Sequence, residues 1–143
     1  MQMTDWFLAP EKEAEAIASI VTTEEKSPED WPHLEFPLLQ MELMALCATL
    51  LDDEAQASES VLEEPLVWDE EGGLCVARVK DAFIQALARV KPAQVEPLVE
   101  AWEAQLEGGE HEPEALGEYL TQLADFARDA VKKRLPVIEL STF

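Results

Sequence analysis

Basic side chains are scarce in this 143-residue sequence: lysine and arginine together number 10, against 31 aspartates and glutamates. The formal net charge is −21 at pH 7. A field of that sign repels the phosphates of nucleic acids and the headgroups of anionic membranes, because both carry negative charge themselves. We therefore expect no nucleic-acid partner.

Long hydrophobic runs are also missing. No apolar stretch approaches the ~20 residues that a membrane-spanning helix needs, and the first ten residues lack the basic and apolar segments of a secretory signal. These features predict a cytoplasmic protein with no membrane partner.

The residue types that usually build metal, redox and phosphate sites are few. Cys47 and Cys75 stand outside any metal-binding or redox spacing, so we expect buried free thiols. The five glycines form no phosphate-binding loop, and neither a Gly-x-Ser-x-Gly elbow nor a His-Glu-x-x-His motif occurs. We expect no cofactor and no metal. Neither His33 nor His111 has a neighbour at a convincing ligand spacing. The sequence therefore does not decide whether either histidine belongs to a site.

What the sequence does contain is enough apolar material for a core. Hydrophobic residues make up 48% of the chain, which argues against disorder despite the charge. A chain of this length buries roughly two thirds of its unfolded surface. We therefore expect one domain over residues 1–143.

The clearest structural pattern lies near the end of the chain. From Pro113 to Pro136 apolar residues recur at spacings of three and four, with acids gathered at the start and bases at the end, as the helix dipole favours. Pro136 should end this long amphipathic helix. Residues 137–140 then read as a strand, and the apolar run at 6–8 is its natural neighbour in a sheet.

The middle of the chain predicts more helices and one hairpin. Helices are expected at 10–22, 38–51, 80–90 and 93–106, the last regular only from near Pro97 because proline removes an interior hydrogen bond. Residues 22–37 contain prolines that exclude a helix interior and are predicted to be a connection. A hairpin is expected at 61–79, with an acidic turn that ends in two glycines.

This order of elements is not an alternation of strands and helices, so a large parallel sheet is not expected. The sequence predicts an α+β fold: a small, mostly antiparallel sheet of about four strands, including both terminal strands, packed against about five helices.

Negative charge is concentrated in the first half of the chain. Residues 1–77 carry 19 acidic and 2 basic side chains, a net −17, whereas residues 78–143 carry 12 and 8, a net −4. Trp68 precedes a run of three acids. Tryptophan is enriched at binding hot spots, although its usual burial favours a place beneath the following helix. The candidate partner-binding residues are Asp52, Asp53, Glu54, Trp68, Asp69, Glu70 and Glu71.

We accordingly expect a non-enzymatic interaction module that presents an acidic surface to a basic protein, in the manner of an immunity protein, an antitoxin or a nucleic-acid mimic. Solubility alone is the competing explanation of the charge. A second expectation is a homodimer with a regulatory or structural role, joined through the helix at 38–51, which is apolar nearly all round. A third is a small hydrolase that uses carboxylates with His33 or His111.

Overall fold

The computed structural model of the chain describes residues 4–23, 26–53, 59–106 and 111–142. Five strands and five α-helices are found within these ranges, and single 3-10 turns lie at Glu11–Glu13 and Pro28–Asp30. In chain order the elements are β1 (Thr4–Leu8), α1 (Ala14–Thr22), β2 (His33–Phe36), α2 (Gln40–Leu51), β3 (Leu62–Asp69), β4 (Leu74–Val79), α3 (Asp81–Ala88), α4 (Pro92–Gln105), α5 (Pro113–Lys133) and β5 (Val137–Thr142).

The strands form one sheet in the order β2-β1-β5-β4-β3, and every neighbouring pair is antiparallel. The predicted α+β class is confirmed. So is the pairing of the two terminal strands, in which Phe7 lies opposite Ile138. β5, the last strand along the chain, therefore occupies the centre of the sheet.

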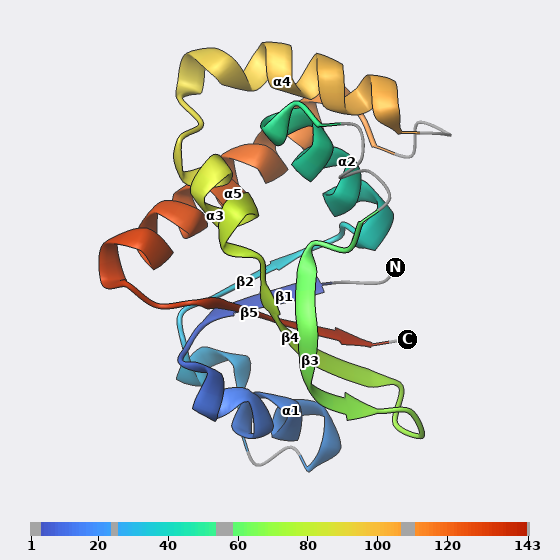
Figure 1. Cartoon of the computed structure of the whole chain (residues 1–143), viewed down its shortest axis with the longest axis vertical. Helices are drawn as coiled ribbons and strands as arrows, with labels where there is room; N and C mark the ends of the chain where they lie inside the picture. The colour runs from blue at the N-terminus through green and yellow to red at the C-terminus, as the bar shows by residue number, and fades with distance from the viewer. Residues whose placement is uncertain (1–3, 24–25, 54–58, 107–110, 143) are drawn as a thin grey trace.

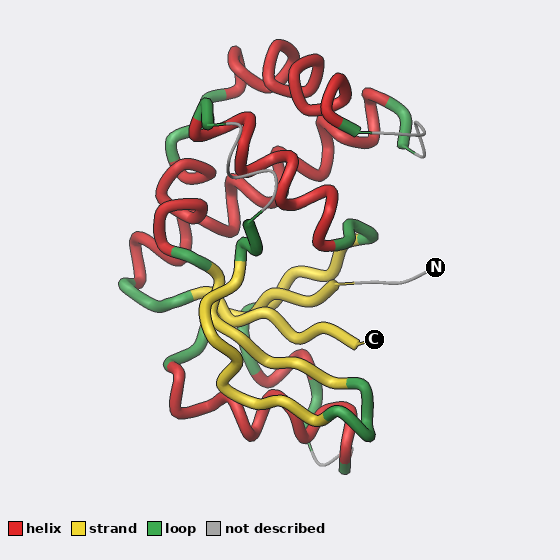
Figure 2. Tube along the Cα trace, turned by 45° about the vertical axis from the view of Figure 1, so that its right-hand side comes forward, coloured by secondary structure: helices red, strands yellow, loops and turns green. Residues whose placement is uncertain are grey.

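The sheet separates two unequal helical layers (Figures 1 and 2). Helices α2 to α5 cover one face and α1 covers the other. Because side chains alternate along a strand, Trp6 and Leu8 of β1 enter the larger core, whereas Phe7 enters the smaller core beside Ile17 of α1. Trp6 is fully buried and meets Phe36 edge-on, with ring centroids 5.2 Å apart.

β2 corrects the prediction that residues 22–37 form only a connection. His33–Phe36 lies between two prolines and pairs with β1, so that Leu34 is opposite Trp6. An edge strand bonds to a neighbour on one side only, so prolines at its ends do not interrupt the ladder. The alternation in four residues was too short to predict a strand.

Helix α4 begins earlier than predicted. Pro92 stands at its start, and Pro97 lies inside the helix rather than at its beginning. The hydrogen bond that Pro97 lacks would have reached the carbonyl of Ala93. Ala93 lies in the exposed first turn, so its carbonyl is open to solvent and needs no partner within the helix. The expectation that the regular helix begins near Pro97 is wrong for this reason.

In the described ranges, no helix combines the length and the apolarity needed to cross a bilayer. The two cysteines are buried and unpaired, as expected.

Gly117, near the start of α5, faces α4 without filling the space between the helices. A Cβ atom there would lie 3.7 Å from Cγ1 of Val95 and 3.9 Å from Cγ2 of Val99, which are ordinary van der Waals distances. Alanine is favoured over glycine by about 1 kcal/mol in a helix interior.

We therefore predict that Gly117→Ala raises the free energy of unfolding by about 0.5–1 kcal/mol, measured by urea denaturation. Gly72→Ala is the matched control and should destabilise, because its Cβ would lie 2.6 Å from Oδ2 of Asp69. A loss of stability in Gly117→Ala would mean that α4 and α5 pack more closely than the structure shows.

Candidate functional site

The β3–β4 hairpin places an aromatic side chain on an exposed sheet edge. Trp68 is 58% exposed and Leu66 39% exposed. Val67 packs into the small core beneath α1, so the strand alternation turns Leu66 and Trp68 to the opposite face. The expectation that Trp68 packs beneath the following helix is wrong. Trp68 pairs with Cys75 near the turn, whereas α3 begins beyond the other end of β4.

The acids of the turn have two different roles. Oδ1 of Asp69 accepts a hydrogen bond of 3.0 Å from the backbone N–H of Gly72, and Gly73 takes a positive φ of 63°. Asp69 thus closes the turn. Glu70 and Glu71 are exposed, and neither forms an ion pair with another residue of the described chain, so their charge faces solvent.

We define the hairpin surface as Glu64, Leu66, Trp68, Glu70 and Glu71. All five are exposed. Sequence reasoning found Trp68 and the turn acids but missed Glu64 and Leu66, whose exposure follows only from the edge position of β3. A long exposed edge is open to pairing with another strand. Here Pro65 lies between two register shifts, and both features oppose strand addition, so this surface offers side chains rather than backbone.

The other acids of the predicted set lie elsewhere. Asp52 is the left-handed cap (φ 50°) at the end of α2, and Asp53 follows it. That end of α2 belongs to the large helical layer, far from the hairpin turn in both overall views. Glu54 lies outside the described residues. The structure therefore does not bring the acids at 52–53 together with the hairpin surface.

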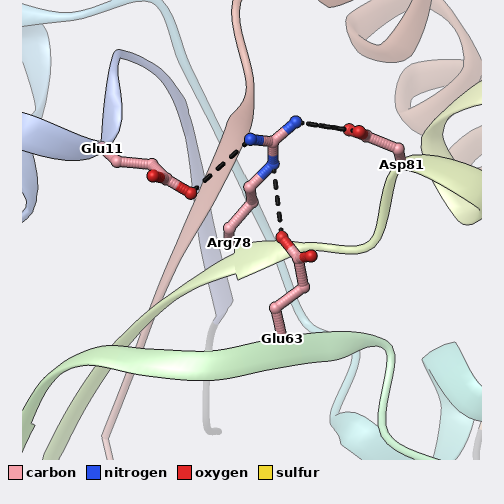
Figure 3. Close-up of polar contacts among 4 residues, drawn as sticks. All are labelled: Glu11, Glu63, Arg78 and Asp81. Atoms are coloured by element: carbon pink, nitrogen blue, oxygen red, sulfur yellow. Dashed lines mark hydrogen bonds and ion pairs between the residues drawn. The ribbon is translucent and has the colours of Figure 1, made fainter.

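Arg78 on β4 is surrounded by three carboxylates (Figure 3). Its guanidinium lies 2.8 Å from Asp81 of α3, 3.3 Å from Glu63 of β3 and 3.5 Å from Glu11 of the first 3-10 turn. The hydrogen bond to Asp81 is the main reason why the pKa of Arg78 is raised. One cation thus holds together parts of the chain that carry like charge.

The two histidines lie on opposite sides of the sheet. Nε2 of His111 is 2.5 Å from Oε2 of Glu42, and the ring of His111 meets Tyr119 edge-on. Oε1 of Glu42 accepts a bond from the backbone N–H of Leu39 at the start of α2. This pair joins the chain before α5 to the first turn of α2, and only about 15% of each side chain is exposed.

His33 lies on the α1 side, where its ring stacks on Phe7. Asp5 and Glu35 face each other across β1 and β2 nearby. Burial, followed by the charge of Glu35, raises the pKa of Asp5 to about 6, while His33 lowers it. Two carboxylates and an imidazole are gathered here. Among the described residues, however, no group of three histidine, cysteine or acidic side chains has the geometry to hold a metal ion.

The most perturbed acid is Glu139, in the centre of the sheet. It is fully buried, and its carboxylate accepts hydrogen bonds from Nε1 of Trp6 (2.9 Å) and Nε2 of Gln40 (2.6 Å). Burial raises its pKa from the ordinary value of 4.5 to about 7, against the opposing effect of these two bonds. A carboxyl group with such a pKa suits acid–base catalysis, but this one is sealed from solvent. Its geometry serves to connect β5, β1 and α2.

Removing the charge of Arg78 should expose the repulsion among its three carboxylates. We predict that Arg78→Met lowers the free energy of unfolding by about 1–2 kcal/mol, and that the loss shrinks at high salt, since screening weakens partly exposed charges. Urea titrations at low and high ionic strength measure both quantities. Lys26→Met makes the same charge change at an exposed position and should have little effect. If Arg78→Met lowered the free energy of unfolding equally at both ionic strengths, the loss would instead reflect packing of the aliphatic part of the arginine side chain.

Glu139 should make stability depend on pH. Because its pKa is higher in the folded than in the unfolded chain, the folded state binds this proton more tightly. The stabilisation is complete below about pH 4.5 and is lost as pH rises through about 7. Wild type should therefore lose about 2–3 kcal/mol relative to Glu139→Gln between pH 5 and pH 8. Chemical denaturation across this range measures the difference. The exposed variant Glu15→Gln should follow wild type, and parallel curves for wild type and Glu139→Gln would contradict the prediction.

No protein-family model matches the chain, and no curated protein matches its sequence. Among solved structures, the chain is similar to the crystal structure of YfbM from Escherichia coli, described as a protein of unknown function. The likeness covers 98% of this chain and 99% of that one, with a TM-score of 0.51 and 9% sequence identity. At that identity the likeness concerns the fold alone, which the two proteins share along nearly their whole lengths.

Proposed function

We propose that this protein is a non-enzymatic interaction module that binds a basic protein through the hairpin surface. The observation that carries the proposal is Trp68, 58% exposed on an edge strand beside the acidic turn. Exposing a tryptophan to water forgoes the free energy of burial that this side chain usually gains. Binding of a partner recovers it.

The charges around Trp68 define the kind of partner. β3 and its turn contain five acids and no basic side chain, and only Glu63 is paired with Arg78. Such a field accelerates the approach of a basic surface, and an aromatic anchor then supplies affinity after contact. An immunity-protein or antitoxin-like role fits this combination. Two buried free thiols suit a reducing compartment, and we place the interaction in the cytoplasm.

The alternative is a homodimer through α2. Most of α2 packs within the molecule against α3 and α4. Its exposed apolar side chains lie at its beginning, where Met41 is 75% exposed and Leu39 is 42% exposed. A dimer would have to use this short end of the helix. Sedimentation at micromolar concentration distinguishes it, since Met41→Lys should convert a dimer to monomer and leave a hairpin-dependent complex intact.

The hairpin proposal predicts that two kinds of variant fail for different reasons. Trp68→Ala should weaken a reconstituted complex by about 2 kcal/mol or more, as at other hot spots. Glu70→Lys with Glu71→Lys should mainly slow association at low salt. Asp69 is left unchanged because it closes the turn. The partner is first captured by the wild-type protein and identified by mass spectrometry, and binding is then measured with purified components.

The control is Glu118→Lys with Asp129→Lys, which makes the same charge change at exposed positions of α5. It should bind like wild type. Capture of the partner that persists in both hairpin variants, or that is lost equally in the control, would overturn the proposal. Solubility would then remain as the explanation of the negative charge.

A further inference from the structure

A groove of about 560 Å³ runs between α4 and the first turns of α5. Helix α4 packs against α2 and α5 and forms the outer margin of the helical layer, at the top of Figure 1. The hairpin surface lies at the other end of the molecule. The groove is therefore a separate surface, and what it binds is independent of the function proposed above.

The floor of the groove is apolar. Val95 is half-buried, Val99 is buried, and Gly117 lies opposite them on α5. Because Gly117 has no side chain, the two helices leave space over the valines that a larger residue would occupy. Pro92 and Pro113, both exposed, stand at the first turns of the two helices and add to the apolar lining.

The rim of the groove is entirely acidic. Glu96, Glu100 and Glu103 recur at spacings of four and three, which places them along one side of α4, and Glu114 contributes from α5. All four are exposed, and no basic residue lines the groove. Within the described ranges none of them has a basic side chain at ion-pair distance. Four negative charges thus surround an apolar floor without internal compensation.

We propose that this groove binds a cationic amphipathic helix from a partner protein. Amphipathic helices commonly bind with their apolar face in a hydrophobic groove. Here an apolar stripe would cover Val95 and Val99, while lysine or arginine on its two flanks would meet the glutamates of the rim. The α4 wall from Pro92 to Glu103 is roughly 17 Å long at the usual helical rise, which matches about three turns of a bound helix. A neutral or acidic helix would leave the four rim charges uncompensated.

The test uses a fluorescent synthetic peptide of about 16 residues, with leucines at helical spacing and lysines on both flanks. Fluorescence anisotropy with the full chain should show saturable binding. Glu100→Lys with Glu103→Lys should weaken it by about tenfold or more, a loss of roughly 1.4 kcal/mol. Both changes lie toward the end of α4, where lysine suits the helix dipole. Gly117→Leu, which fills the floor and leaves the charge unchanged, should also weaken binding, by about fivefold or more. Circular dichroism checks that each variant is folded.

Glu15→Lys with Glu29→Lys is the matched control, because it makes the same charge change at exposed positions outside both the groove and the hairpin surface. It should bind the peptide within about twofold of wild type. Equal losses in both charge variants, or equal binding of a peptide with the same lysines but scrambled leucines, would show unspecific attraction and overturn the proposal. So would sedimentation of the protein alone as a dimer that Gly117→Leu dissociates, since a second copy would then fill the groove. None of these outcomes depends on Trp68, so failure here leaves the hairpin proposal standing.

Discussion

The hydrogen bond from Trp6 to Glu139 joins residues 133 positions apart in the sequence, and much of the molecule is arranged around it. Trp6 is the aromatic centre of the large core, edge-on to Phe36 and Phe83. Glu139 occupies the central strand and also accepts from Gln40 at the start of α2. A single buried carboxyl group therefore fixes the two terminal strands and the start of α2 relative to one another. A carboxylate alone in this core would be costly to bury, and its two donors and raised pKa are the means by which it is tolerated.

The treatment of charge is the second constraint. Most acids in the described part of the chain are exposed to water, and where three carboxylates approach one another a cation lies between them. Arg78 serves Glu11, Glu63 and Asp81 in this way, whereas the pKa of Asp5 is raised first by burial and then by the charge of Glu35. At the hairpin surface, acids instead border the exposed side chains of Leu66 and Trp68, and at the α4–α5 groove they border an apolar floor. That combination, rather than the net charge, is the basis of the two binding proposals.

Periodic patterns predicted most of the fold. The apolar spacing and the terminal charges of residues 113–136 gave α5 and its limits, and the acidic turn with two glycines gave the hairpin. β2 escaped prediction because four residues between prolines carry too little pattern. Helix α4 was predicted, but its regular start was placed too late because the effect of Pro97 depends on whether the carbonyl of Ala93 is exposed. The candidate site was predicted in part. Glu70 and Glu71 can be recognised in the sequence as part of an acidic run. The exposure of Trp68 and the distance of Asp52 and Asp53 from the hairpin follow only from the order of the strands in the sheet. The groove depends on packing of α4 against α5, which no local pattern encodes.

The place of β5 also governs how the chain can fold. Its neighbours β1 and β4 lie far back along the chain, so all four other strands are synthesised before the strand that unites them. Until β5 emerges, Trp6 lacks its acceptor and each half presents an unpaired edge to the crowded cell. Closing such distant contacts is slow compared with local helix formation, and incompletely folded chains with open edges are prone to associate. The dense negative charge of the earlier half repels other chains of the same sequence during that interval.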